Sequence, residues 1–410
     1  MKQNAIVAGV GMTHFGKHLE TGLKAIGAEA VQLAIKDAGI TLDDIQAAYV
    51  GNAAAGLVTG QECIRGQVIL RSIGMGRIPV VNVENACASG STAVQQAAMM
   101  VSAGAYDIVL ALGAEKLYSE DRKKSFAAFS GGVDVEMVQA IMASLQQKAA
   151  KEGASAGTSG AGEKRSMFMD IYAEVARSHM EKYGTTAEQF AMVSAKNSFH
   201  GSLNPRAQFR DEMTVQQVLA APVIAEPLTR PMCSPIGDGA AAVVIVSERK
   251  ARELGISKPV RIVASVLRSG WDRNEDDETA GDVVAREAYE QAGVGPSDIS
   301  VIELHDASAP GEIMAYDYLG LCPKGEGGRL VQSGATKLGG RQPVNTSGGL
   351  LRKGHPVGAT GVAQIVELTE QLQGRSGARQ VAGARLGLAH NGGGHIGTDV
   401  AAICVSILQA

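Results

Sequence analysis

The chain has 410 residues, more than the roughly 250–300 at which one hydrophobic core stops growing, so about two core-bearing units are expected. Hydrophobic residues make up 45% of the chain and charged residues 20%, a balance typical of a folded globular enzyme and not of a disordered or fibrous protein. The formal net charge is −4, and no run of Lys or Arg is present. We therefore expect neither a nucleic acid nor an anionic membrane as a partner.

The longest purely apolar stretch, residues 240–246, is far shorter than the roughly 20 residues that span a bilayer. The first residues, MKQNAIVAGVG, predict a short polar lead into a buried strand, without the apolar core of a signal peptide. Five cysteines without regular spacing argue against a disulfide framework and for a reducing compartment. These features predict a cytoplasmic protein.

Two segments in opposite halves of the chain share a sequence. Residues 27–45 align without gaps to residues 281–299, with six identities in 19 positions. Each predicts an amphipathic helix that ends at a glycine, Gly39 or Gly293, and is followed by a turn and a strand. An apolar strand precedes each helix. Helices that alternate with β-branched strands predict an α/β fold made of two copies of one unit.

A second shared segment lies further along each copy. Residues 87–97 align to residues 355–365, with four identities in 11 positions. Glycine and small hydroxyl residues precede a long apolar-periodic run in each, so each is expected to open a helix. Cys87 and His355 therefore occupy equivalent positions. If the copies pack about a pseudo-twofold axis, the two helix starts converge on one site.

Residues 120–220 have no counterpart in the second copy. We expect an inserted loop region that covers the active-site face, with a passive surface excursion as the alternative. Its part 151–164 is rich in Gly, Ala and Ser and is predicted to be mobile. The predicted domains are a first half of residues 1–119 with 221–250, a loop domain of 120–220, and a second half of 251–410.

Cys87 is the candidate nucleophile. It follows a predicted strand and stands at the start of a helix, where unpaired N–H groups and the helix dipole are expected to lower a thiol pKa and favour thiolate. The same amides can donate to an oxyanion on an acylated sulfur. The other four cysteines are expected to be small buried hydrophobes.

Three histidines are candidate partners of this sulfur. His355 lies in a glycine-rich turn and is paired with Cys87 by the repeat, so it can serve as the proton acceptor that covalent catalysis requires. His305 follows a strand of the second copy, at the carboxyl end where α/β sites gather. His390 likewise ends a strand and enters a glycine cluster. A structural role is the alternative for each of the last two.

Two other kinds of site are not supported. Gly9 and Gly11 follow a strand, but no third glycine comes at the spacing of a dinucleotide-binding turn. His355, His390 and His395 show no metal-type spacing, and no CxxC accompanies them, so no metal is expected.

Four motifs in order resemble the thiolase superfamily: NACASGS around Cys87, HDAS from His305, VNTSGGLLRKGHPVGATG around His355, and HNGGG from His390. The chain looks most like sterol-carrier-protein-type thiolases and the bacterial and archaeal thiolases that carry HD in place of NEAF. The resemblance covers nearly the whole chain. It implies a five-layered αβαβα thiolase fold of two similar halves with a loop domain, and at least a dimer.

The resemblance also implies roles for single residues. Cys87 resembles the nucleophile that accepts the acyl group, and His355 the histidine that activates it and helps to bind the thioester oxygen. His305 replaces the asparagine that organises the rest of this first oxyanion site. The backbone N–H groups of Cys87 and Gly392 resemble a second oxyanion hole. The implied reaction makes or breaks a carbon–carbon bond of a 3-oxoacyl-CoA, with coenzyme A as a substrate and no bound cofactor.

One departure concerns the second acid/base. Ordinary thiolases carry a second cysteine in a C-x-G motif, where this chain has His390, and sterol-carrier types carry one directly after HD, where this chain has Ala307. His390 or His355 performs this proton transfer, or the substrate needs no strong base, or the reaction has changed. Imidazole suits transfer near neutral pH.

Several expectations concern ligands and partners. A homodimer or tetramer is expected, and some members of this type, including one that cleaves benzoylsuccinyl-CoA, act with a small OB-fold protein that binds acyl-CoA. A bulky or branched acyl group is the expected substrate. Two other functions remain open: a thiolase-like retro-aldol lyase, which Cys87 disfavours, and a non-catalytic acyl-CoA-binding subunit. The candidate CoA contacts are Lys196, Asn197, Arg206 and Ser234.

Overall fold

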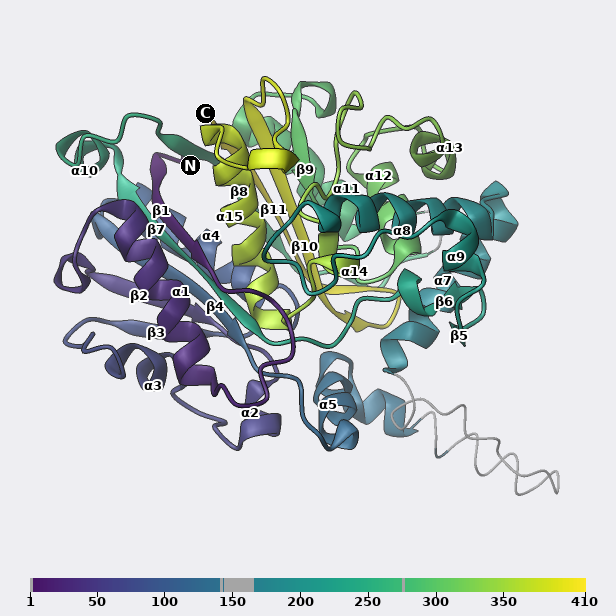
Figure 1. Ribbon diagram of the computed structural model, residues 1–410, viewed down its shortest axis with the longest axis horizontal. Helices are drawn as coiled ribbons and strands as arrows, with labels where there is room; N and C mark the ends of the chain where they lie inside the picture. Colours follow the sequence, from purple (N-terminus) through teal and green to yellow (C-terminus); the bar gives the residue numbers. More distant parts are fainter. Residues whose placement is uncertain (1–2, 141–142, 144–165, 275–276) are drawn as a thin grey trace.

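The computed structural model describes residues 3–140, 143, 166–274 and 277–410 (Figure 1). The segment 151–164, predicted to be mobile, lies outside the described residues. Within the described part of the chain, no helix is both long and apolar enough to cross a membrane.

Nine of the described strands form one mixed sheet in the order β3-β2-β4-β7-β1-β8-β11-β10-β9, and β5 and β6 pair separately. In the first half these are β1 (Ala5–Met12), β2 (Ala47–Gly51), β3 (Val80–Val83), β4 (Ile108–Glu115) and β7 (Gly239–Ser247). In the second half they are β8 (Val260–Arg268), β9 (Val301–Glu303), β10 (Leu386–Ile396) and β11 (Asp399–Gln409). The order reads outward identically from the central β1–β8 pair, because β7, β4 and β2 are matched by β11, β10 and β9.

The central pair joins the halves over a short length. Strand β1 pairs antiparallel to β8 through three residues, Ala5, Ile6 and Val7, opposite Ile262, Arg261 and Val260. Antiparallel strands at the centre of a symmetric order indicate a pseudo-twofold axis between the two copies. The duplication read from the sequence is therefore present in the sheet.

Helices fill the layers around the sheet. On the outer side of the first half lie α1 (Leu23–Ala38), α2 (Ala55–Thr59) and α3 (Arg65–Arg71), and on the outer side of the second half lie α11 (Ala280–Ala292) and α12 (Ala309–Tyr318). Between the two halves of the sheet lie α4 (Ser89–Ser102) and α15 (Thr360–Gln373), which share one apolar core with both. The predicted glycine caps are present, since Gly39 and Gly293 end α1 and α11 with φ of 67° and 70°. The α/β thiolase-type layering expected from the sequence is confirmed.

The two central helices touch backbone to backbone. A Cβ on Gly90 of α4 would lie 2.6 Å from the carbonyl oxygen of Gly358, and one on Gly361 of α15 would overlap the backbone of Ser91. Glycine at both positions permits this approach. The first turns of α4 and α15, which follow Cys87 and His355, are thereby held together.

The inserted region lies between β4 and β7, whereas the equivalent strands β10 and β11 are joined by a tight hairpin. Its described elements are α5 (Arg122–Phe129), α7 (Met167–Tyr183), α8 (Ala187–Ser202), α9 (Val215–Leu219), β5 (Val223–Ala225) and β6 (Leu228–Thr229). Helix α8 packs against α12, α13 (Gly327–Gln332) and α14 (Gly349–Arg352) of the second half, and α10 (Glu248–Glu253) follows β7. On this basis we propose to keep the division into 1–119 with 221–250, 120–220, and 251–410.

Candidate active site

A strained turn presents Cys87 in front of α4. Ala86 adopts φ of 47°, a left-handed conformation that costs a residue with a side chain about 1–2 kcal/mol. Ser89 holds the turn, because its hydroxyl accepts from the N–H of Asn85 at 2.9 Å and donates to the carbonyl of Ala86 at 2.7 Å. Ala88 is the N-cap of the helix, so Cys87 stands directly before it. The predicted place of the cysteine, after a strand and before a helix, is confirmed.

The His355 ring is held by one hydrogen bond that also fixes its tautomer. Its Nδ1 lies 2.7 Å from the hydroxyl of Thr360, and that hydroxyl donates its own hydrogen to the carbonyl of Pro356 at 3.2 Å. The hydroxyl must therefore accept from Nδ1–H. The remaining nitrogen, Nε2, keeps a free lone pair and can accept a proton.

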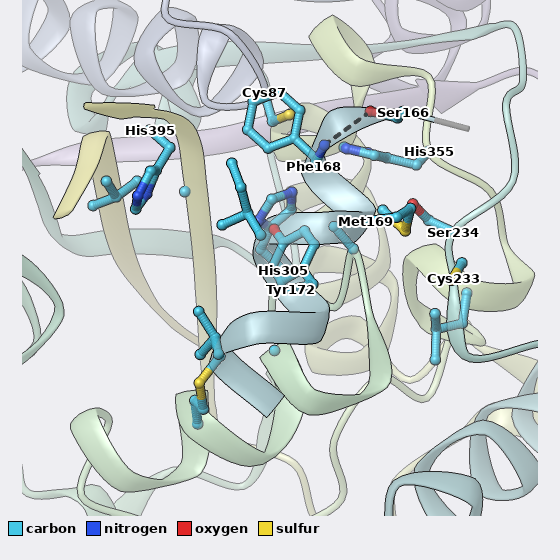
Figure 2. Close-up of a pocket in the computed structure, with 18 of the residues that line it drawn as sticks. Cys87, Ser166, Phe168, Met169, Tyr172, Cys233, Ser234, His305, His355 and His395 are labelled. Carbon is cyan, nitrogen blue, oxygen red and sulfur yellow. Dashed lines mark hydrogen bonds between the residues drawn. The ribbon is translucent and has the colours of Figure 1, made fainter. Parts of the chain in front are cut away.

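The sulfur and two imidazoles meet in one place. One ligand atom each of Cys87, His305 and His355 lies within 4.8 Å of the other two. The rings of His305 and His355 stand edge to face with centroids 5.1 Å apart. Figure 2 shows the three side chains together on the wall of the cavity. The convergence that the duplication predicts is present.

The electrostatics of Cys87 differ from the prediction. Burial raises the pKa of Cys87 to about 12, and the nearby carboxylate of Glu115 adds to this effect. Backbone N–H groups of Cys87 itself and of Gly394 act in the opposite direction and are outweighed. The expected low thiol pKa is therefore wrong for the empty site, because desolvation exceeds the contribution of the helix terminus. The resting residue is a thiol and needs a base to become a nucleophile.

The histidines provide neutral bases. Burial, followed by the charges of His305 and Lys353, holds the pKa of His355 well below its usual value. Burial lowers the pKa of His305 to about 4. The Nε2 of His305 is buried without a hydrogen-bond partner, so a polar group faces the cavity unsatisfied. A substrate oxygen placed there would relieve the cost of burying it.

His390 is already occupied by the protein. Its Nδ1 accepts from the N–H of His305 at 3.4 Å, and its Nε2 lies 3.2 Å from the hydroxyl of Tyr318. Burial and the charge of His305 lower its pKa to about 3. The ring lines the cavity, but both nitrogens have partners. This arrangement favours a role for His390 in holding the backbone of His305.

The glycine cluster after His390 approaches the sulfur. Gly392 lines the cavity, and a Cβ on it would lie 3.8 Å from Nδ1 of His305. The N–H that acts on the sulfur of Cys87, beside the cysteine's own, belongs to Gly394. The glycine triplet was visible in the sequence, but which of its amides faces the sulfur was not.

Lys196 and Asn197 lie in the core and not where CoA could reach them. The ammonium of Lys196 donates to the carbonyl of Val344 and pairs with Glu312, both at 2.8 Å. Asn197 is fully buried and donates to Asp306 at 2.8 Å and to Glu312 at 2.9 Å. Both side chains serve to fix the HD loop, because Asp306 in turn accepts from the first N–H groups of α14.

Of the other two candidate CoA contacts, Ser234 lines the cavity and Arg206 does not. Arg206 forms a two-point ion pair with Glu370 and lies outside the cavity lining. Ser234 lines the cavity, and its N–H donates to the carbonyl of Ala307 at 3.0 Å. Only Ser234 is placed near the three converging side chains (Figure 2).

The site opens into a cavity of about 1160 Å³, larger than the roughly 300–1,000 Å³ of most small-molecule pockets. Helices α5 and α7 of the inserted region form one wall with mostly apolar side chains, namely Phe126, Phe129, Phe168, Met169, Ile171, Tyr172 and Val175. Exposed cations, Lys17, Arg230 and Lys324, also border it. The insertion therefore forms part of the site and is not a passive excursion.

The same three ligand atoms of Cys87, His305 and His355 are also close enough to hold a metal ion. A thiolate with two imidazoles suits a soft ion such as Zn²⁺. His390 and His395, considered from the sequence as metal ligands, do not belong to this cluster.

Three contributors were not predicted. Thr360 sets the tautomer of His355 and could have been found from its match to Thr92 in the repeat. Glu115 and Tyr172 lie in segments that belong to none of the motifs, so no signal in a single sequence points to them.

Comparison with known proteins agrees with this geometry. The family model described as "Thiolase, N-terminal domain" matches residues 5–249, and that described as "Thiolase C-terminal domain-like" matches residues 272–406. An acetyl-CoA acetyltransferase of Methanothermobacter thermautotrophicus is 41% identical over 97% of this chain and 98% of its own length. Benzoylsuccinyl-CoA thiolase subunit BbsB of Thauera aromatica is 36% identical over 96% of each chain. Human sterol carrier protein 2 is 36% identical over 95% of this chain and 70% of its own.

Solved structures share the fold over the whole length. The structure titled "Ltp2-ChsH2(DUF35) aldolase" superposes with a TM-score of 0.78 at 27% identity, covering 99% of this chain and 98% of the other. Human mitochondrial 3-ketoacyl-CoA thiolase in complex with CoA gives 0.70 at 16% identity, covering 100% and 99%. The chain belongs to the thiolase family and is an acyltransferase of the thiolase type.

Proposed function

We propose that the protein cleaves or forms the carbon–carbon bond of a 3-oxoacyl-CoA through an acyl group carried on Cys87. The observation that supports this most directly is the approach of the Cys87 sulfur to imidazole nitrogens of His355 and His305 within 4.8 Å. A thiol whose pKa is raised to about 12 needs an adjacent base, and the free Nε2 of His355 supplies one.

The steps follow from the charges in the site. In cleavage, His355 takes the thiol proton, and the thiolate of Cys87 attacks the 3-oxo carbon. The bond to the α-carbon breaks, and its electron pair becomes an enolate on the departing thioester. Polar groups that face the cavity without partners, such as Nε2 of His305, would stabilise the enolate oxygen. We assign the second oxyanion hole to the N–H groups of Cys87 with Gly394 or Gly392. CoA then takes the acyl group, so CoA is a substrate and no bound cofactor is required.

A bulky or branched acyl group is the proposed substrate. The cavity of about 1160 Å³ with an apolar wall from α5 and α7 exceeds the space that a two-carbon acyl group needs. The name of the relative from Thauera aromatica, a benzoylsuccinyl-CoA thiolase subunit, agrees with a large acyl group. For the CoA phosphates we propose the bordering cations Lys17, Arg230 and Lys324, in place of the buried Lys196 and Asn197.

The proposed assembly contains a second copy of the chain. Strand β3 is an edge of the sheet, and Val81 on it is 44% exposed. An unprotected apolar edge strand favours pairing with another strand.

A small OB-fold partner remains part of the proposal, because the aldolase with the similar fold carries a DUF35 protein in its title. We propose a cytoplasmic location, since all five cysteines are free thiols.

Trapping with radiolabelled acetyl-CoA and, in parallel, with radiolabelled benzoyl-CoA, followed by peptide mapping, tests the acyl-enzyme. Labelled Cys87 that releases its acyl group to free CoA supports the proposal, and Cys87→Ser should take no label. If the wild-type protein takes no label and cleaves a 3-hydroxyacyl-CoA instead, it is the retro-aldol lyase that the fold neighbour suggests. If it binds acyl-CoA without either reaction, it is a non-catalytic subunit.

A further inference from the structure

Several hydroxyls line the cavity, and the charge of Cys87 acts on one of them, that of Tyr172. Thiolase chemistry moves two protons, one from the attacking sulfur and one to or from the α-carbon. His355 accounts for the first, and a separate group must handle the second. His390 and Ala307 occupy the two places where a second cysteine would be expected.

The available groups near the sulfur are few. His390 has both nitrogens engaged, by His305 and by Tyr318, and the Tyr318 hydroxyl is engaged in return. Ala307 has no ionisable atom. A serine hydroxyl such as that of Ser234 exchanges protons with carbon far less readily than a phenol does, because its pKa lies well above that of tyrosine.

Tyr172 remains. It comes from α7 of the inserted region and lines the same cavity as Cys87, His305 and His355. Its ring and the carbonyl of His305 both lie beside Gly311, 3.7 and 3.8 Å from where a Cβ would stand. Figure 2 shows Tyr172 and His305 among the side chains that line the pocket. Burial raises its pKa, and the charges of Cys87 and Asp306 raise it further, as expected for a hydroxyl close to both.

We propose that Tyr172 is the second proton-transfer residue, which donates to the α-carbon of the departing thioester and recovers a proton from CoA. This proposal rests on the proposed function. It assigns a catalytic task to the inserted region, whose helix α7 contributes Tyr172 to the cavity that His305 and His355 also line.

The protons balance in the cleavage direction. His355 takes the proton of Cys87, and the sulfur attacks the 3-oxo carbon. The carbon–carbon bond breaks, and the electron pair left on the α-carbon takes the hydrogen of Tyr172, which leaves a phenolate opposite the imidazolium. Incoming CoA gives its thiol proton to this phenolate and attacks the acyl group. The Cys87 thiolate leaves and recovers its proton from His355.

Tyr172→Phe tests the assignment because it removes one oxygen and keeps the ring. Acetyl transfer from acetyl-CoA to Cys87 should fall by less than about tenfold, since a thiolate of pKa near 8.5 leaves without an acid. Thiolysis of acetoacetyl-CoA should fall by about 10²–10⁴, the usual contribution of a positioned acid or base. Exchange of the α-hydrogens of acetyl-CoA with D₂O should fall in parallel. Tyr106→Phe, outside the cavity, is the matched control.

The outcomes separate the two proposals. If wild-type Cys87 takes a label from neither acetyl-CoA nor benzoyl-CoA, the proposed function fails and this assignment with it. If labelling occurs and Tyr172→Phe keeps thiolysis within threefold of wild type, only the role of Tyr172 is overturned. An equal loss of acetyl transfer, thiolysis and exchange also overturns it, because the tyrosine would then shape the pocket without moving a proton.

Discussion

The first turns of α4 and α15 are built alike and deliver different chemistry. In each, a threonine hydroxyl donates to the carbonyl four residues earlier, Thr92 to Ala88 at 2.8 Å and Thr360 to Pro356 at 3.2 Å. The oxygen of Thr92 then accepts from Asn85 in the turn before the nucleophile, whereas that of Thr360 orients His355. The same backbone device therefore positions the nucleophile in one copy and the base in the other.

The strand ends beside these helices differ more. If the gap-free alignment is extended, Gly51 and Asn52 match His305 and Asp306. In the first copy the amide of Asn52 donates to the carbonyl of Ala114 at 2.6 Å, and the buried carboxylate of Glu115 accepts from the N–H of Gly358 at 2.9 Å. That corner is filled by protein hydrogen bonds. Each corner keeps one buried polar atom without a partner, Oδ1 of Asn52 and Nε2 of His305, but of these two residues only His305 lines the cavity that holds Cys87.

Replacing the base, His355, should have the largest effect on the rate of the reaction. His355→Asn retains a donor for Thr360 but cannot take a proton from Cys87. We expect kcat/KM for thiolysis to fall by about 10³–10⁴. His14→Asn, at an exposed histidine outside the cavity, is the control. A loss below tenfold would mean that another group deprotonates the sulfur.

Substitution of Thr92 and of Thr360 compares the roles of the two equivalent hydroxyls. Thr360→Val lets the proton of His355 move to Nε2, the nitrogen that must be free, and should lower kcat by about 10–100-fold. Thr92→Val should cost about 1–3 kcal/mol of stability for two lost hydrogen bonds and less than about fivefold in rate. Steady-state kinetics and urea unfolding of both variants distinguish the roles, and equal kinetic losses would contradict them.

The carboxylate of Glu115 accepts from the N–H of Gly358 and also acts on the charge of Cys87. Because its negative charge raises the pKa of Cys87, Glu115→Gln should lower that pKa below about 12. Alkylation by iodoacetamide should then be faster at pH 8, by about tenfold for each pKa unit lost. Glu84→Gln should show a smaller change, since Glu84 is exposed and acts less strongly. An unchanged alkylation profile would show that burial alone sets the thiol pKa.

Acid should act more on the second half than on the first, because the second half contributes His305, His355 and His390. All three have pKa values below the 6.5 of an unfolded histidine. Above pH 6.5 these histidines are neutral in both the folded and the unfolded chain. Below pH 6.5 they bind protons in the unfolded chain first. Stability should therefore fall by about 1.4 kcal/mol per pH unit for each histidine, down to pH about 4 for His305 and about 3 for His390.

Urea unfolding at pH 7.0 and 5.5 measures this loss, and hydrogen exchange locates it. Protection in β9, β10 and α15 should fall before that in β2 and α1. Equal loss in both halves would indicate that carboxylates, and not these histidines, govern the acid limb.

The fold could be predicted from the sequence because the duplication leaves matching segments in the two halves of the chain. Matched glycine caps at Gly39 and Gly293 and matched helix starts at Cys87 and His355 define the axis without coordinates. The proton state of Cys87 was not accessible, since it depends on burial and on Glu115, which reaches the site from another strand. Lys196 and Asn197 read as phosphate ligands in sequence, but tertiary packing buries them beside carboxylates.

Contact between α4 and α15 without intervening side chains has an evolutionary consequence. Gly90 and Gly361 have no side chain at the crossing, so no substitution can bring the two helices closer together. Any larger residue at either position would push the two helix starts apart. The spacing between nucleophile and base therefore cannot be adjusted gradually. A new reaction in this fold would therefore come from other groups around the fixed pair of helix starts, or from a different inserted region.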